Sequence, residues 1–360
     1  MIILSLLRDY LEYLIPLVMC FLVSFVAINA IKPFAIKFGL VDKPNERKKH
    51  VGNIPLIGGV AIFIGVVISA SVFLNEKIAI DIYFLISSLI LLVGVLDDKF
   101  ELSIYLKIIV QIIIALMMVF QADYYLTSFG KIFGSFELTL GYFGVFFTVI
   151  AVIGAINAFN MVDGIDGLAG MLSIISFSFL ALLLFRAGSN WYLLALLFDS
   201  AILAYLIFNL SLIKSLNKIF MGDAGSMLIG LTIIWLLVVG VSPEVNAFKP
   251  VTALYIIAIP LMDLTAVIYR RLKRGVSPFH PDRNHLHHIF QEIGFSEQKT
   301  LFAITMLSFI FATFGVMADI YQFPEWIMFG LYLLMYALYF ISILNLLKSS
   351  EMSKNQYHSW

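Results

Sequence analysis

Long apolar runs dominate this sequence and limit what it can fold into. A helix that spans a bilayer needs roughly 20 mostly apolar residues. We identify eleven such runs, at residues 11–31, 54–74, 80–96, 104–122, 140–159, 167–186, 190–210, 224–241, 250–269, 301–317 and 325–347. Charged residues make up only 13% of the 360 residues, about half of the roughly 25% in soluble globular proteins. A soluble enzyme, a nucleic-acid-binding protein and a disordered chain are therefore excluded, and the sequence predicts an all-α integral membrane protein.

Basic residues are concentrated in one set of the segments between these runs. Eighteen of the 23 lysines and arginines fall in that set and five in the other. Loops rich in Lys and Arg face the cytoplasm, so we expect cytoplasmic loops at residues 32–53, 97–103, 160–167, 211–223 and 270–300. An odd number of spans then puts the N-terminus outside and the C-terminus in the cytoplasm. Residues 1–360 are expected to form a single polytopic membrane domain. The one cysteine, Cys20, excludes a disulfide framework and a Cys-based metal site.

Aspartates lie at the membrane edge of these loops. Asp97 and Asp98 are neighbours at the end of the third run, and Asp223 lies between Gly222 and Gly225 where the eighth run begins. Mg²⁺ is usually held by one or two carboxylates together with substrate phosphates, so these residues are candidate ligands of a hard cation. A solvated loop is the alternative for Asp97 and Asp98, and helix capping is the alternative for Asp223.

Four polar residues at a spacing of three follow the fifth run. They are Asn157, Asn160, Asp163 and Asp166, and both aspartates precede a glycine. At the end of a helix this spacing keeps successive polar groups near one face, and each glycine lets the backbone approach a ligand. A tight turn would need one Asp-Gly step rather than this series, so the pattern favours a ligand site.

The longest loop combines arginines with histidines. Four of the six histidines lie in residues 280–288, close to Arg270, Arg271 and Arg283. Zinc is a rival interpretation, but no Cys-x-x-Cys or His-Glu-x-x-His spacing is present. Arg with neutral or protonated His suits phosphate oxygens better. The aspartates therefore lie on the same face as basic groups that suit a phosphorylated substrate. Because carboxylates and phosphates repel each other, we expect a divalent cation to bridge them at the membrane surface.

Two carboxylates interrupt the apolar runs themselves. Asp263 follows Pro260, where we expect a kink, and a supporting role next to the site is predicted for it. Asp199 lies near the middle of the seventh run, where an ionised carboxylate costs about 2.5–3.5 kcal/mol. No role is assigned to Asp199, and protonation or pairing within the bundle is expected.

Three long motifs resemble one enzyme family, the polyprenyl-phosphate N-acetylhexosamine-1-phosphate transferases. They are Asn157-Ala-Phe-Asn-Met-Val-Asp-Gly-Ile-Asp-Gly-Leu, Phe220-Met-Gly-Asp-Ala-Gly-Ser and Ser277-Pro-Phe-His-Pro-Asp-Arg-Asn-His-Leu-His-His. They occur in the family's order, and the resemblance runs from Gly39 to His288. It implies ten or eleven spans, a cytoplasmic active site, and transfer of GlcNAc-1-phosphate from UDP-GlcNAc to undecaprenyl phosphate with Mg²⁺ or Mn²⁺, releasing UMP.

The resemblance also implies roles for individual residues. It assigns metal binding to Asp223, Asp97 and Asp98, and catalytic positions to Asp97, Asp98, Asp163 and Asp166. Nucleotide binding is implied for Asn160, Asp163, Asp166, Asn209 and Phe220, with Phe220 stacking on uracil. Phosphate or sugar binding is implied for Lys48, Arg283, His285, His287 and His288, with Asp263 in support. Direct displacement is favoured over a covalent aspartyl-phosphate intermediate.

Two rival functions remain open at this point. One is a sibling transferase that uses another sugar nucleotide, such as UDP-MurNAc-pentapeptide. The other is a secondary transporter, although transporters bind their substrates near the bilayer midplane and these aspartates lie at one edge. The expected setting is the bacterial inner membrane, with membrane lipid as a partner and no nucleic acid, at the first membrane step of a cell-surface polysaccharide pathway. A homodimer is left open.

Overall fold

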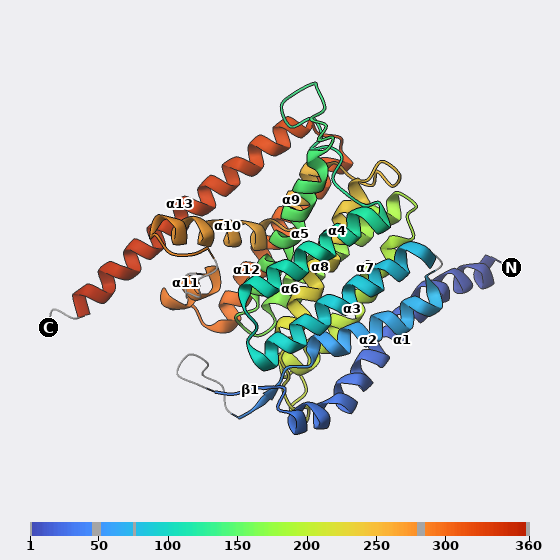
Figure 1. The fold of residues 1–360 in the computed structure, drawn as a ribbon, viewed down its shortest axis with the longest axis horizontal. Coiled ribbons are helices and arrows are strands. Elements are labelled where there is room, and N and C mark those ends of the chain that lie inside the picture. The colour runs from blue at the N-terminus through green and yellow to red at the C-terminus, as the bar shows by residue number, and fades with distance from the viewer. Residues whose placement is uncertain (1, 45–51, 75–76, 279–284, 358–360) are drawn as a thin grey trace.

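The computed structural model describes residues 2–44, 52–74, 77–278 and 285–357, and it is mostly helical (Figure 1). In these residues nine helices are long and apolar enough to cross a membrane. They are α1 (Ile2–Phe38), α3 (Lys77–Phe100), α4 (Ile104–Ala122), α5 (Phe143–Val162), α6 (Leu168–Arg186), α7 (Trp191–Asn209), α8 (Gly222–Val241), α12 (Glu297–Ile320) and α13 (Glu325–Tyr357). An all-α membrane protein, as the sequence predicts, is consistent with this architecture.

Two further predicted runs have a different form. Helix α2 (Gly58–Phe73) has only 16 residues. The ninth run is divided into α9 (Pro250–Ile256) and α10 (Ala258–Lys273), which meet at an angle of 82°. Each predicted run therefore has a helical counterpart, and several helices continue beyond the predicted limits. Helix α1 ends at Phe38 rather than at residue 31, and α3 ends at Phe100 rather than at residue 96.

The break between α9 and α10 follows from Pro260. Proline has no N–H group to donate to the carbonyl four residues earlier, and its ring clashes with that carbonyl. The carbonyl in question belongs to Ile256, where α9 ends, and it accepts a hydrogen bond of 3.1 Å from the Ser176 hydroxyl instead. The kink predicted at Pro260 is confirmed, and the break itself lies three residues earlier, at Ile257.

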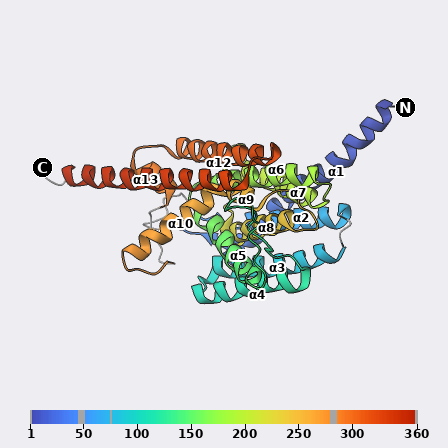
Figure 2. The same ribbon diagram turned by 90° about the horizontal axis from the view of Figure 1, so that it is seen from above.

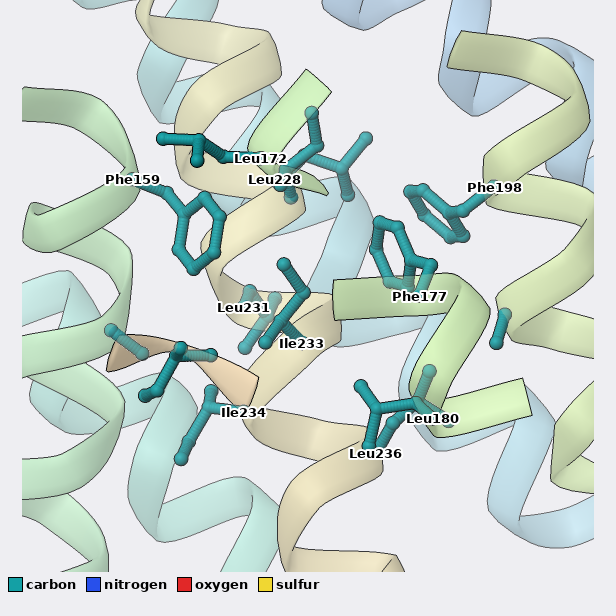
Figure 3. Packing of buried hydrophobic residues seen from close by; sticks show 14 of the residues in the cluster. Phe159, Leu172, Phe177, Leu180, Phe198, Leu228, Leu231, Ile233, Ile234 and Leu236 are labelled. Carbon is teal, nitrogen blue, oxygen red and sulfur yellow. The ribbon is translucent and has the colours of Figure 1, made fainter. Parts of the chain in front are cut away.

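Helix α8 forms the centre of the bundle. Its residues are buried almost throughout, as expected for a helix that is apolar on every side. Leu228, Leu231 and Ile233 of α8 pack with Phe159 of α5 and Phe177 of α6 (Figure 3). In the view of Figure 2, α12 and α13 form one side of the molecule, α3 and α4 the other, and α8 lies between them.

Close backbone packing fixes the beginning of α8. A Cβ on Gly59 would overlap the backbone of Gly225, and one on Gly94 would overlap the backbone of Ala224. Only glycine permits helices α2 and α3 to approach α8 this closely. The first turn of α8, which carries Asp223, is therefore held from two sides.

Two short strands bring the first loop to the same place. Strand β1 (Val41–Asp42) pairs antiparallel with β2 (Ile54–Pro55). The chain then runs beside Phe220, whose N–H donates to the Pro55 carbonyl at 2.9 Å and whose carbonyl accepts from the Gly58 N–H at 3.0 Å. The segment before α8 is thereby fixed next to the start of α2.

Asp199 has a partner inside the bundle. Its Oδ2 accepts a hydrogen bond of 2.9 Å from the Ser178 hydroxyl of α6, and the residue is 9% exposed. Pairing within the bundle, one of the two outcomes expected from the sequence, is confirmed.

Candidate active site

The predicted site residues that the structure describes converge at one end of the helix bundle. Helices α3 and α5 end there, and α4, α6 and α8 begin there. A short helix, α11 (Leu286–Glu292), and its N-cap bring His285, His287 and His288, which we call the histidine segment, to the same end. We call this the polar end of the bundle; it includes the connecting residues 163–167 and 210–221. Residues as far apart in the sequence as Asp97 and His288 therefore contribute to one site.

Asp97 is held in place by two donors. The N–H of Leu102 donates to its Oδ1 at 2.8 Å, and the ammonium group of Lys107 contacts its Oδ2 at 2.6 Å. Asp97 is only 5% exposed. Lys107 comes from the first turn of α4, so an ion pair fixes the end of α3 against the beginning of α4.

Asp98 caps the central helix from outside. Its Oδ1 accepts from the N–H of Asp223 at 2.8 Å, and its Oδ2 accepts from the N–H of Ala224 at 3.3 Å. The first N–H groups of a helix lack partners within the helix, and a carboxylate is favourable at this positive end. Gly222 has a φ of +73°, and a Cβ there would crowd the Asp98 carboxylate. Capping by Asp223 itself, the alternative from the sequence, is wrong because Asp98 supplies the cap.

Asp223 faces other polar side chains. Its Oδ1 accepts from the Asn160 amide at 3.0 Å, and the same amide group donates to the Ser226 hydroxyl at 3.0 Å. The carboxyl group of Asp97 lies within hydrogen-bonding reach of Asp223. Asn160, predicted at the nucleotide side, therefore also orients the Asp223 carboxylate.

The facing carboxylates of Asp97 and Asp223 fit a divalent cation in their chemistry. Two carboxylates this close repel unless a proton or a cation compensates them. Among the described residues, no group of three or more His, Cys, Asp or Glu side chains is arranged as a complete metal site. Mg²⁺ uses few protein ligands and completes its shell with water and substrate phosphates, so a pair is sufficient. Asp98 fits a ligand role less well, because both of its oxygens accept from backbone N–H groups.

Asp163 and Asp166 lie in the turn between α5 and α6. Burial, together with the negative charges of Asp223 and Asp166, raises the pKa of Asp163 to about 7. Asp166 forms an ion pair with Lys218, whose ammonium nitrogen lies 5.2 Å from the centre of the Phe220 ring. The two aspartates are thus in different environments, one crowded by negative charge and one neutralised by a lysine.

Asn209 joins two connecting segments rather than facing a free surface. Its Oδ1 accepts from the Gly167 N–H at 2.7 Å, and its Nδ2 donates to the Ile219 carbonyl at 3.0 Å. The residue is 2% exposed. Asn209, predicted to bind the nucleotide, is therefore buried below the surface, where it fixes the beginning of α6 and the residue next to Phe220.

The histidine segment reaches the Asp-Gly turn. His285 contacts Asp263 through its Nδ1, at 2.9 Å from the carboxylate Oδ2. The rings of His285 and His287 stack with their planes 7° apart, and the centres of the His287 and His288 rings are 4.2 Å apart. A Cβ on Gly164 would overlap the His287 ring. Asp263 thus stands behind the histidines, as the sequence predicts.

His287 is a neutral group at physiological pH. Burial, together with the neighbouring His288, lowers its pKa to about 3. It is 2% exposed, and its Nε2 has no hydrogen-bond partner among the described residues. A neutral imidazole donates or accepts one hydrogen bond at each nitrogen, so His287 suits a polar ligand group better than it suits charge neutralisation. Lys48 and Arg283 lie outside the described residues.

Several polar partners in the site were given no role by the sequence analysis: Ser226 ends the motif that begins at Phe220, and Lys107, Lys218 and Gln111 lie outside the motifs. Lys107, Lys218 and Ser226 contact Asp97, Asp166 and Asn160, and Gln111 accepts from Asn157 at 2.9 Å. The only signal in the sequence is a charged or amide side chain inside an otherwise apolar run, as for Lys107 and Gln111 in α4. Such residues are rare in membrane helices and face polar surroundings.

Comparison with known proteins gives consistent matches. The model of the family described as "Glycosyl transferase family 4" matches residues 80–241. A protein of Salmonella typhi is 43% identical over 325 residues, covering 90% of this chain and 89% of the relative. A protein of Yersinia pestis is 44% identical over 326 residues, with coverage of 90% and 89%. One of Haemophilus influenzae is 42% identical over 331 residues, with coverage of 90% and 92%. All three relatives are named undecaprenyl-phosphate alpha-N-acetylglucosaminyl 1-phosphate transferase.

Proposed function

The chain belongs to glycosyl transferase family 4, among the undecaprenyl-phosphate α-N-acetylglucosaminyl 1-phosphate transferases, and on that premise we propose that it transfers GlcNAc-1-phosphate from UDP-GlcNAc to undecaprenyl phosphate. The products are undecaprenyl-diphosphate-GlcNAc and UMP. One observation carries the proposal from the site itself: Asp97 and Asp223 face each other at the polar end of the bundle, beside basic groups that suit phosphates.

The reaction joins two anions. An oxygen of the lipid phosphate forms a bond to the β-phosphorus of UDP-GlcNAc, and the bond from that phosphorus to the oxygen bridging to the α-phosphate breaks. UMP leaves with that oxygen and its electron pair. A phosphate monoester has a second pKa near 6, so most of the lipid phosphate is already dianionic at neutral pH. The main demand on the protein is to bring the anions together and offset their charge.

Asp97 and Asp223 are the proposed ligands of Mg²⁺, with Mn²⁺ as a substitute. Neutralising charge on phosphate oxygens is the chemistry that the bound ion supplies. Lys107 holds Asp97 in position, and Asn160 does the same for Asp223. Asp98 acts through α8, by fixing the helix start that carries Asp223. Single displacement at phosphorus remains the proposed course, without a covalent enzyme intermediate.

The nucleotide side of the site is proposed around Phe220, Asp163 and Asp166. An aromatic ring offers a base a stacking surface, and Lys218 lies over that ring while paired with Asp166. The pyrophosphate of the donor competes with Asp166 for the lysine. His285, His287 and His288 hold the donor's phosphate or sugar, with His287 as a neutral hydrogen-bonding group. Lys48 and Arg283 complete the proposed set of basic groups.

The membrane arrangement that we propose has eleven crossings, with the N-terminus outside and the polar end in the cytoplasm. Two features support the orientation: the asymmetric distribution of basic residues and the cytosolic supply that a nucleotide sugar implies. Nine of the described helices are long enough to cross, the bent pair α9 and α10 would be the tenth crossing, and the 16-residue α2 would be the eleventh. An inner-membrane location and a place at the first membrane step of a cell-surface polysaccharide pathway follow from the same reaction.

The donor is the feature that a direct experiment tests best. The purified protein in detergent, given undecaprenyl phosphate, should form a lipid-linked product with UDP-GlcNAc and none with UDP-MurNAc-pentapeptide. Product from the second donor alone would assign the chain to the sibling activity. Uptake of solute into vesicles without any lipid-linked product would identify a transporter instead.

Removal of divalent cations is expected to stop the reaction. With excess EDTA the transfer rate should fall at least about 20-fold, because the charge of the two substrates and of Asp97 and Asp223 is then uncompensated. Added Mg²⁺ or Mn²⁺ should restore the rate, and Ca²⁺, which prefers more oxygen ligands at longer distances, should restore less of it. Transfer that continues unchanged in EDTA would contradict the proposed metal dependence.

Gly164→Ala is expected to disturb the histidine segment. The new Cβ would overlap the His287 ring, so either the turn or α11 must shift, and we expect turnover to fall about tenfold. Gly154→Ala is the matched control, because a Cβ there meets no other atom within 4 Å and alanine favours the helix. Steady-state transfer rates of both variants test this. Equal rates for the two variants would show that the contact between Gly164 and His287 has no functional importance.

A further inference from the structure

A tyrosine from the last helix reaches the support of the histidine segment. The hydroxyl group of Tyr339 in α13 donates to the Oδ1 of Asp263 in α10 at 3.3 Å. Asp263 and Tyr339 are 2% and 8% exposed, so the contact is enclosed. Helix α13 otherwise lies at the side of the molecule (Figure 2), and no motif in it indicates a link to the site.

Asp263 takes part in three hydrogen bonds at once, with partners from two other elements. Its Oδ1 also accepts from the backbone N–H of Leu286 at 3.0 Å, and its Oδ2 lies 2.9 Å from the Nδ1 of His285. The carboxylate thereby joins α10, α13 and the beginning of α11. An ionised carboxylate can only accept hydrogen bonds, so the Nδ1 of His285 must carry a proton.

This arrangement directs the Nε2 of His285 away from Asp263 and determines whether that nitrogen donates or accepts a hydrogen bond. With the proton on Nδ1, the Nε2 of a neutral His285 ring is an acceptor, and the hydrogen bond to Asp263 fixes the plane of the ring. His287 stacks on that plane at an angle of 7°. The orientation of one ring is thus passed to the next.

We propose that Tyr339 and Asp263 act together as positioning residues that set the tautomer and orientation of His285. Through His285 they orient the face of the histidine segment that binds UDP-GlcNAc. The inference rests on the proposed function and deepens it. Neither residue touches substrate. Tyr339 contributes by holding Oδ1, so that Oδ2 remains directed at the histidine.

Tyr339→Phe tests the hydroxyl group while keeping the ring. Loss of one buried hydrogen bond should lower kcat/KM for UDP-GlcNAc about 3- to 10-fold. We expect this loss as a higher KM for UDP-GlcNAc, with kcat changed less than about twofold. Tyr336→Phe is the matched control. Tyr336 lies one turn earlier on α13, with its ring against Phe340, and its substitution should leave both constants unchanged.

Asp263→Asn tests the same pair from its other side. The amide offers one oxygen to three donors, so its NH₂ group must face either His285 or another donor. When it faces His285, it forces the proton from Nδ1 to Nε2. We expect kcat/KM for UDP-GlcNAc to fall about 30- to 100-fold, more than for Tyr339→Phe.

The decisive measurement is coupling through His285. If Tyr339 acts through that ring, Tyr339→Phe should change kcat/KM by less than about 1.5-fold in a His285→Gln protein. The same three- to tenfold loss in both backgrounds would mean that Tyr339 only stabilises the fold, and would overturn the inference. So would a Tyr339→Phe protein indistinguishable from the Tyr336→Phe control.

These outcomes are separate from a failure of the proposed function. If the unaltered protein transfers no GlcNAc-1-phosphate, the proposed function itself is wrong. If it is active and the two tyrosine variants behave alike, only the positioning role is wrong. Thermal unfolding of each variant in detergent completes the comparison, and Tyr339→Phe should unfold within a few degrees of the Tyr336→Phe control.

Discussion

Asparagine in place of Asp223 is expected to lower GlcNAc-1-phosphate transfer at least about 1,000-fold. The change removes the charge from one of the two facing carboxylates but keeps an oxygen that can accept from Asn160 at the same position. Folding should therefore be preserved while the proposed cation site loses half of its protein charge. Initial rates at saturating UDP-GlcNAc and undecaprenyl phosphate measure the effect.

Asp199→Asn provides the control for this prediction. Asp199 is an aspartate of the same bundle that pairs with Ser178 and lies outside the polar end. An asparagine there can still accept that hydrogen bond, and we expect activity within about twofold of the unaltered protein. If Asp223→Asn retained a rate comparable to that of Asp199→Asn, Asp223 would have no part in the reaction.

Replacement of Asp98 is expected to have the second largest effect, by way of α8. In Asp98→Ala the N–H groups of Asp223 and Ala224 lose their acceptor, which should cost about 1–2 kcal/mol in the free energy of unfolding. The displaced helix start would move Asp223, and we expect transfer to fall at least about 100-fold. Chemical denaturation in detergent and the transfer rate are measured on the same preparation.

Asp98→Asn separates the capping role from a role of the charge. Asparagine caps helices about as well as aspartate, so the stability should return to within about 0.5 kcal/mol of the unaltered protein. With the helix start restored, transfer should be within about tenfold of the unaltered protein. An Asp98→Asn protein that is stable but as inactive as Asp98→Ala would contradict a role through α8 and indicate direct participation of the carboxylate.

The helices were predictable because their cause is local. Twenty apolar residues in succession have few alternatives to a buried or membrane-spanning helix, and a proline inside such a run must free a carbonyl. The kink at Pro260 followed from that rule alone. The position of the break could not be predicted from that rule. It depends on the Ser176 hydroxyl, 80 residues away in the sequence, which donates a hydrogen bond to the free carbonyl of Ile256.

The site was predictable as a set of residues, but not as a set of contacts. Motif positions placed Asp97, Asp163 and Asp223 at one end of the bundle, where they lie. The cap that Asp98 supplies to α8 spans 125 residues, and no spacing within either helix reports it. The same holds for Tyr339, whose hydroxyl reaches Asp263 across 76 residues. A helical spacing describes one face of one helix, whereas these contacts require the packing of two.

The protonation state of the histidines could not be predicted from the sequence either. A histidine has an ordinary pKa of about 6.5, so a pattern of histidines leaves charged and neutral forms open. Burial decides the matter for His287, with its pKa of about 3. The group that a pattern associates with phosphate is, in its folded surroundings, an uncharged hydrogen-bonding partner.

The fate of the β-phosphate tests the proposed reaction most directly. UDP-GlcNAc carrying ³²P at the β-position and a carbon label in the sugar is incubated with the purified protein, undecaprenyl phosphate and Mg²⁺. Both labels should appear together in the lipid, with one unlabelled UMP released for each product. If the sugar alone reached the lipid and ³²P remained in released UDP, the chain would be transferring a sugar rather than a phosphosugar, and the central proposal would be wrong.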